Sequence, residues 1–105
     1  MIDDHGDISL YPTVEAASME IEAVDVLDAV YEAFDSRGRR LCLLVVEGLV
    51  SIRLDPKSVP EPDELLRRLR HFIARVGADR VGVDNVESVS LDVAVLALAR
   101  FFHIT

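Results

Sequence analysis

An unbroken apolar run, LCLLVV at residues 41–46, constrains the fold of this chain more than any other feature. Turn signals lie on both sides of it: residues 35–39 (DSRGR), in which Gly38 can take the positive φ of a tight hairpin, and residues 47–48 (EG). Because side chains alternate along a strand, a strand over residues 40–47 would carry apolar side chains on both faces. We therefore expect this strand to lie in the middle of a sheet, with cover on both sides.

Two further strands are expected beside this central one. Residues 29–35 and 49–54 are rich in β-branched, aromatic and other apolar side chains and lie between turn signals. In residues 49–54 apolar and polar side chains alternate, so one face of that strand should meet water. The prolines at 56, 60 and 62 then mark a linker, because proline cannot continue a β-ladder. The sequence predicts a three-strand antiparallel meander.

The clearest helix covers residues 63–76. Its apolar side chains recur at intervals of three and four residues: Leu65, Leu66, Leu69, Phe72, Ile73 and Val76. Asp63 and Glu64 favour a helix start, because carboxylates stabilise the positive end of the helix dipole, and Gly77 favours a helix end.

Before the meander, residues 1–6 are expected to be disordered, and residues 7–11 to form a short strand. Pro12 and Thr13 then predict the start of a helix, because a threonine side chain can accept a hydrogen bond from a free N–H of the first turn. Apolar side chains at helical spacing should form its inner face: Val14, Ala17, Ile21 and Val24. The carboxylates between them would then lie on the outer face.

After residue 77 the pattern is weaker. Residues 78–89 are compatible with a loop containing a short strand at 80–83, and Ser90 can cap a last helix that runs through Phe102. This last helix is apolar all around its axis, which is typical of a helix buried under a sheet or in an association surface. The sequence therefore predicts one α+β domain over residues 1–105: a small antiparallel sheet, a three-strand meander plus a short N-terminal strand, packed with two to three helices.

Charge is divided unevenly along the chain. Residues 1–35 contain ten carboxylates and no lysine or arginine, so the other residues hold 11 basic and 9 acidic side chains, against a net −8 for the whole chain. A surface of this kind repels nucleic acid and anionic lipid and attracts basic partners. We expect a basic protein partner, with no nucleic acid and no membrane; negative charge that only maintains solubility is the other interpretation.

Side chains suited to catalysis or metal binding are few. His5 lies among aspartates in a segment expected to be disordered, His71 lies within a helix, and Cys42 lies in the most apolar strand, where a thiol behaves as a small hydrophobe. The sequence contains no zinc-ligand spacing and no phosphate-binding glycine loop. We expect a non-enzyme with no metal and no cofactor. The acidic N-terminus and the single cysteine predict a cytoplasmic protein.

Arginines supply the one basic patch, at positions 67, 68, 70 and 75 of the expected helix. Nucleic acid binding by this patch is not favoured, because the chain is acidic and no aromatic side chains are interleaved with the arginines. We expect these arginines to pair with carboxylates of the acidic first third.

The stretch DISLYPTVEAASMEIEAVDVLDAVYEAFDSRGRRL, residues 7–41, resembles small acidic bacterial immunity proteins of polymorphic and contact-dependent toxin systems. The matching features are Asp7-Ile8, Thr13-Val14-Glu15, Asp25-Val26, Tyr31-Glu32-Ala33-Phe34-Asp35 and Gly38-Arg39. The likeness extends over about residues 7–77. The chain departs from the pattern at residues 27–30, which replace a glycine expected before the strand, and in its apolar last helix. The resemblance implies a protein that caps a toxin domain and has no catalytic residues.

Three functional hypotheses follow. The first is an immunity-type binding protein that occludes a basic cleft of a toxin, because a row of carboxylates can act as a polyanion mimic. Its expected contact residues are Glu15, Glu20, Glu22, Asp25, Asp28, Glu32 and Asp35. The second is a self-associating domain, such as a homodimer, that uses the last helix and the spare face of the central strand. The third is a small enzyme or ligand-binding protein with a pocket around His71 or Glu32.

Overall fold

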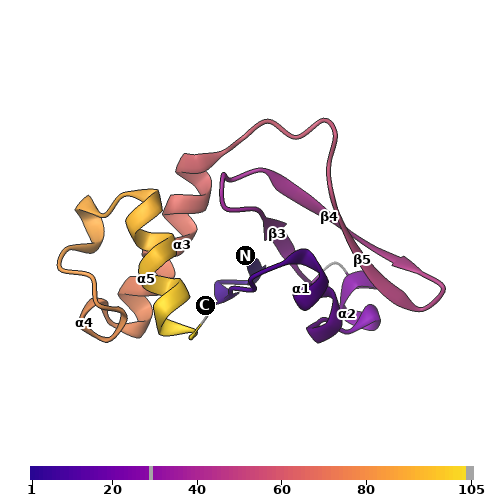
Figure 1. Cartoon of the computed structure of the whole chain (residues 1–105), viewed down its shortest axis with the longest axis horizontal. Coiled ribbons are helices and arrows are strands. Elements are labelled where there is room, and N and C mark those ends of the chain that lie inside the picture. Colours follow the sequence, from indigo (N-terminus) through magenta and orange to yellow (C-terminus); the bar gives the residue numbers. More distant parts are fainter. Residues whose placement is uncertain (29, 104–105) are drawn as a thin grey trace.

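The computed structural model describes residues 1–28 and 30–103. In these residues an antiparallel sheet of strand order β2-β1-β3-β4-β5 is packed with helices on both faces, as expected for an α+β domain (Figure 1). The strands are β1 (Ile2–Asp4), β2 (Asp7–Ser9), β3 (Glu32–Phe34), β4 (Arg40–Val46) and β5 (Leu49–Leu54). The helices are α1 (Val14–Glu20), α2 (Ala23–Leu27), α3 (Pro62–Val76), α4 (Ala78–Val81), the 3-10 turn η1 (Val86–Ser88) and α5 (Leu91–Phe101).

The N-terminal segment is ordered, so the expectation of disorder over residues 1–6 is wrong. Strand β1 pairs with β2 on one side and with β3 on the other. His5 and Gly6 both take positive φ, 52° and 97°, which closes the tight β1–β2 hairpin. Ile2 is buried, and removal of this apolar side chain from water stabilises the pairing of the short strand with the sheet.

The expected meander is confirmed as β3, β4 and β5. Gly38 has φ of 82° in the first turn, and Glu47 and Gly48 have φ of 53° and 77° in the second turn. Strand β3 begins at Glu32, later than the expected start; Ala29 lies outside the described residues. The sheet has five strands because β1 and β2 form a hairpin, where a single N-terminal strand was expected.

One face of the sheet packs against α1 and α2. Antiparallel partners lie on the same face, so Ile2, Ala33 and Leu41 share this face through their pairings. They form a core with Ala17 and Ile21, the buried residues at the end of α1. Thr13 caps α1 as expected, because its side chain accepts a hydrogen bond from the Ala16 N–H. The helix ends at Glu20, and a bend at Ile21 leads into α2.

The opposite face packs against α3 at the β2–β1–β3 end of the sheet. Ile8 and Phe34 point to this side and are buried with Leu65, Leu69 and the rest of the larger core. Helix α3 has the expected bounds to within one residue, and α5 packs on α3 rather than under the sheet. In Figure 1 α3, α4 and α5 form the left end of the molecule, while α1 and α2 lie below the hairpin at the right.

Two expectations at the C-terminal end and in the central strand are wrong. Residues 80–83 do not form a strand: α4 occupies Ala78–Val81, and Gly82 ends it in the left-handed conformation. Strand β4 lacks cover on its second face, where Leu44 and Val46 are exposed, because α3 extends only over the other end of the sheet. Ser90 caps α5 as expected.

Candidate functional site

Five of the seven carboxylates expected at the interface lie together along α1 and α2. We call this set the acidic surface: Glu15, Glu20, Glu22, Asp25 and Asp28. Four of them are exposed, and Asp25 is half-buried. In the described part of the chain none of the five forms an ion pair. Their negative charge is therefore directed to solvent without an internal counterion.

Asp25 is the most constrained member of the acidic surface. The Tyr31 hydroxyl donates to Asp25 Oδ2 over 3.2 Å. Burial raises the pKa of Tyr31, and the bond to Asp25 raises it further, so this hydroxyl stays a donor at neutral pH. The bond joins α2 to the segment that enters β3.

Large apolar side chains are interspersed among these carboxylates. Met19, Val24 and Leu27 are all exposed. Val24 was expected on an inner helix face, in one continuous helix through residue 24, and that expectation is wrong. The bend at Ile21 breaks that helix, so Val24 belongs to α2 and lies with Leu27 at a spacing of three residues. The exposure of Met19 and Leu27 was not predicted, because helical periodicity was used only to find the apolar residues of the inner face.

Glu32 and Asp35, the other two expected contact residues, are placed elsewhere. Glu32 in β3 is the antiparallel partner of Asp3 in β1, and partners point to the same face of a sheet. Glu32 therefore lies on the face opposite α1 and α2. Its Oε2 accepts from Arg40 Nη1 over 2.6 Å and from Arg68 Nη2 over 3.0 Å. Glu32 is consequently neutralised within the molecule.

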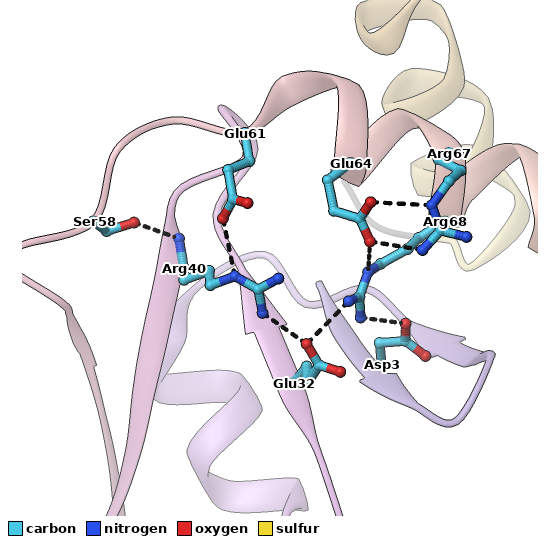
Figure 2. Close-up of polar contacts among 8 residues, drawn as sticks. All are labelled: Asp3, Glu32, Arg40, Ser58, Glu61, Glu64, Arg67 and Arg68. Atoms are coloured by element: carbon cyan, nitrogen blue, oxygen red, sulfur yellow. Dashed lines mark hydrogen bonds and ion pairs between the residues drawn. The ribbon is translucent and has the colours of Figure 1, made fainter.

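These contacts belong to a larger set, which we call the arginine network (Figure 2). Its members are Asp3, Glu32, Arg40, Glu61, Glu64, Arg67 and Arg68. Arg68 is its centre: Nη1 donates to Asp3 Oδ2 over 2.9 Å, and Nε donates to Glu64 Oε1 over 2.8 Å. The network thus joins β1, β3 and β4 to the start of α3.

An aromatic ring supports the two central guanidinium groups. The Cζ atoms of Arg40 and Arg68 lie 4.8 and 4.9 Å from the ring centroid of Phe34, which is completely buried. Cation–π contacts at this distance are attractive, and they hold both guanidinium planes beside the carboxylates. The two arginines therefore stabilise the packing of α3 on the sheet.

Hydrogen bonds within the network shift the pKa values of Glu32, Glu64 and Arg68. Hydrogen bonds from Arg40 and then Arg68 lower the pKa of Glu32, and bonds from Arg67 and Arg68 lower the pKa of Glu64 to about 2. Burial alone would lower the pKa of Arg68, but its bonds to carboxylates outweigh burial and raise it. Glu32, Glu64 and Arg68 therefore stay charged at neutral pH.

Asp35 is neutralised in the turn before β4. It accepts hydrogen bonds from the backbone N–H groups of Arg37 and Arg39, over 3.0 and 2.9 Å, and from Arg39 Nε over 2.7 Å. Burial acts to raise the pKa of Asp35, but these bonds outweigh it and the pKa is lowered. Arg39 and Arg40 thus pair with the last two carboxylates of the acidic first third, Asp35 and Glu32.

The described residues line several hollows, and two of them bear on the search for a ligand site. The larger, of about 270 Å³, is lined mainly by apolar side chains from both cores, including Leu10, Ala17 and Leu69. The smaller, of about 160 Å³, contains His71 together with Arg67 and Arg68. Both arginines are bonded to Glu64, and Arg68 also to Asp3, so the two guanidinium groups at the smaller hollow already have carboxylate partners.

Within residues 1–28 and 30–103, no three His, Cys, Asp or Glu side chains are grouped to hold a metal ion. None of the helices in the same residues combines the length and the hydropathy needed to cross a bilayer. The chain matches no protein-family model, and neither curated proteins nor solved structures show significant similarity to it.

Proposed function

We propose that the protein is a non-catalytic binding protein whose acidic surface holds a basic partner protein. In the form suggested by the resemblance to immunity proteins, the partner is a cognate bacterial toxin, and the acidic surface occludes its basic cleft in the cytoplasm. The proposal needs an outward cluster of uncompensated carboxylates, and α1 and α2 carry such a cluster.

The observation that supports the proposal best is the mixture of side chains on this surface. Carboxylates without an internal counterion surround the exposed Met19, Val24 and Leu27 in the sequence. Protein interfaces combine apolar anchors with a polar rim, and methionine adapts its shape to a partner. A surface of carboxylates alone would mimic a polyanion, whereas this mixed surface is complementary to a partner protein that presents both cationic and apolar side chains.

Pairing with arginines of the same chain reduces the number of carboxylates available to a partner. Glu32 and Asp35 already accept hydrogen bonds from arginines of the same chain. A partner would have to displace these arginines, which would cost the free energy of their bonds. The contact surface that we propose is therefore Glu15, Glu20, Glu22, Asp25 and Asp28.

The test uses the product of the neighbouring reading frame as the candidate partner, co-expressed and purified with this protein. The dissociation constant would be measured at low and high salt for the wild type and for two double variants. Glu20→Lys with Glu22→Lys reverses the acidic surface; Asp84→Lys with Glu87→Lys is the control, with two exposed carboxylates far from it in sequence. Each substitution adds two charges, so both double variants carry −4 in place of −8.

We expect the first double variant to weaken binding by about tenfold or more, and the control by about threefold or less. Charges within the interface contribute more to affinity than charges that act only by long-range attraction. Binding of the wild type should weaken as salt rises. Equal losses for both variants would show that only net charge matters, and unchanged binding of the first variant would remove the acidic surface from the interface.

A further inference from the structure

The β4–β5 hairpin carries a second exposed surface of different character. On one face Leu44, Val46 and Leu49 are 45%, 51% and 73% exposed. Val46 pairs directly with Leu49 across the hairpin, and Leu44 follows Val46 at the two-residue spacing of one face. The three side chains are neighbours, and they form an apolar strip. We call this surface, with Cys42, Ser51 and Arg53, the hairpin face.

The hairpin face and the acidic surface lie on opposite sides of the sheet. Leu41, Leu43 and Ile52 point to the side that α1 and α2 cover, and the strip points the other way because side chains alternate. The hairpin extends away from α3, α4 and α5, with α1 and α2 beneath it (Figure 1). Among the described residues no strand pairs with the outer edge of β5.

Charge is distributed so that a second copy can approach this face with little repulsion. The whole chain carries −8, and residues 1–35 contain ten carboxylates without a basic residue. The hairpin, residues 40–54, contains Arg40, Arg53 and Glu47 as its charged side chains, a net +1. Two copies that meet here keep their acidic surfaces on the outside, far from each other, which limits like-charge repulsion.

We propose that the hairpin face binds the hairpin face of a second copy, giving a two-fold symmetric dimer. A two-fold interface uses the same patch on both subunits, so the strip covers its own apolar side chains with those of its copy. Glu47 lies at the hairpin tip and Arg53 near the other end of β5. A two-fold axis between them lets each Glu47 approach Arg53 of the second copy. A basic partner protein has its counterpart in the acidic surface, whereas this near-neutral strip offers it no charge to pair with.

The test is the mass of the protein in solution, by sedimentation equilibrium over a wide range of concentration. The variant Leu44→Ser with Leu49→Ser removes the apolar side chains of the strip. The control, Val93→Ser with Leu96→Ser, removes side chains of similar exposure, 53% and 52%, from α5. We expect the hairpin variant to raise the dimer dissociation constant by about tenfold or more, and the control to change it by about twofold or less.

The salt dependence of dimerisation is an independent test of the proposal. Each copy carries −8, and exposed ion pairs such as Glu47 with Arg53 contribute little, so screening of the net repulsion should outweigh their loss and strengthen the dimer. Salt should instead weaken binding of a basic partner at the acidic surface. The failure of one proposal is thus separable from the failure of the other. A wild type that stays monomeric at every concentration and salt would overturn the dimer, as would loss of association in the α5 control alone. If the double variant does not fold, Leu49→Ser at the most exposed position of the strip repeats the test.

Discussion

The arginine network and the acidic surface use carboxylates from the same third of the chain in opposite ways. Asp3 and Glu32 meet Arg68, which follows them by 65 and 36 residues. Glu20 and Glu22 meet no cation among the described residues. The sheet separates the two groups: α3 and β4 bring arginines to one face, and α1 and α2 lie on the other. Topology therefore decides which carboxylates stabilise the fold and which remain available to a partner.

The two groups of carboxylates also differ in burial, which determines how strongly their charges contribute to the free energy of unfolding. The side chains of Asp3 and Arg68 are 8% and 14% exposed, so their attraction acts in a medium of lower dielectric constant than water. The acidic surface lies in water, where like charges repel weakly and salt screens them. Variants of each group should consequently differ strongly in their effect on the free energy of unfolding.

The largest effect is expected for Arg68→Met. Methionine keeps much of the apolar stem over Phe34, but it leaves the buried Asp3 without its guanidinium and removes one of the two guanidinium groups that bind Glu64. A buried charge that loses its partner costs several kcal/mol, and discounting for the partly exposed Glu32 and Glu64 we expect a loss of about 3 kcal/mol. Urea unfolding at neutral pH measures it.

Arg67→Met is the matched control. Arg67 also binds Glu64, but its side chain is 66% exposed, so its removal should lower the free energy of unfolding by about 0.5 kcal/mol or less. Equal losses in both variants would contradict the view that burial of Asp3 and Arg68 distinguishes the network from an ordinary surface ion pair.

Gly38→Ala should have the next largest effect. Gly38 has φ of +82°, and an added Cβ would lie 2.7 Å from the carbonyl carbon and oxygen of Glu61. The Glu61 N–H donates to the Gly38 carbonyl, so the contact also places Glu61 beside Arg40. We expect a loss of about 2 kcal/mol, from strain at positive φ and the forced shift of the linker.

Gly48→Ala separates strain from crowding. Gly48 has φ of +77° with no atom within 4 Å of the added Cβ, so we expect a loss of about 1 kcal/mol, smaller than for Gly38. Thermal unfolding compares the two variants, and a larger loss at Gly48 would show that the contact with Glu61 is unimportant.

Local chemistry explains which elements could be predicted from the sequence. The meander, the helix through Val76 and the caps at Thr13 and Ser90 depend on turn residues and on periodicity within a few positions. Strand β1 was missed because its partner β3 begins 30 residues after Ile2, and Ile2 is the one apolar side chain of the strand itself. Sequence separation of this kind hides a pairing from any local pattern.

The candidate site was predictable to a similar extent. The excess of carboxylates before residue 36 predicted an anionic region and its pairing with later arginines, and Arg68 confirms that pairing with Asp3 and Glu32. Arg67 instead pairs with Glu64 on its own helix. No pattern in one chain separates Glu20, which is unpaired in the described residues, from Glu32, which is paired, because both stand among apolar residues in acidic surroundings.

Acid should weaken the network within a defined pH range. Arg67 and then Arg68 lower the pKa of Glu64 from its ordinary 4.5 to about 2, and the pKa of Glu32 is lowered as well. Between these values the unfolded chain binds protons that the folded protein does not, so the free energy of unfolding should fall as pH falls from about 4.5 to about 2. Urea unfolding across this range measures the slope.

Arg68→Met provides the comparison for this slope. Without Arg68 the pKa values of Glu64 and Glu32 should move back toward their ordinary values, and stability should depend less on pH in the same range. A slope identical to that of the wild type would place the acid sensitivity outside the arginine network.

The smallest effect, and one of opposite sign, is expected at the acidic surface. Glu20→Gln with Glu22→Gln removes two exposed charges that repel their neighbours and pair with no arginine among the described residues, so stability should rise by about 0–0.5 kcal/mol at low salt. High salt should abolish the gain, because screening already weakens the repulsion. Thermal unfolding at two salt concentrations is sufficient, and a loss of stability would mean that these carboxylates have partners within the fold. A gain would show that the chain keeps an electrostatic arrangement unfavourable to its own folding, which is the arrangement that a binding surface for a basic partner requires.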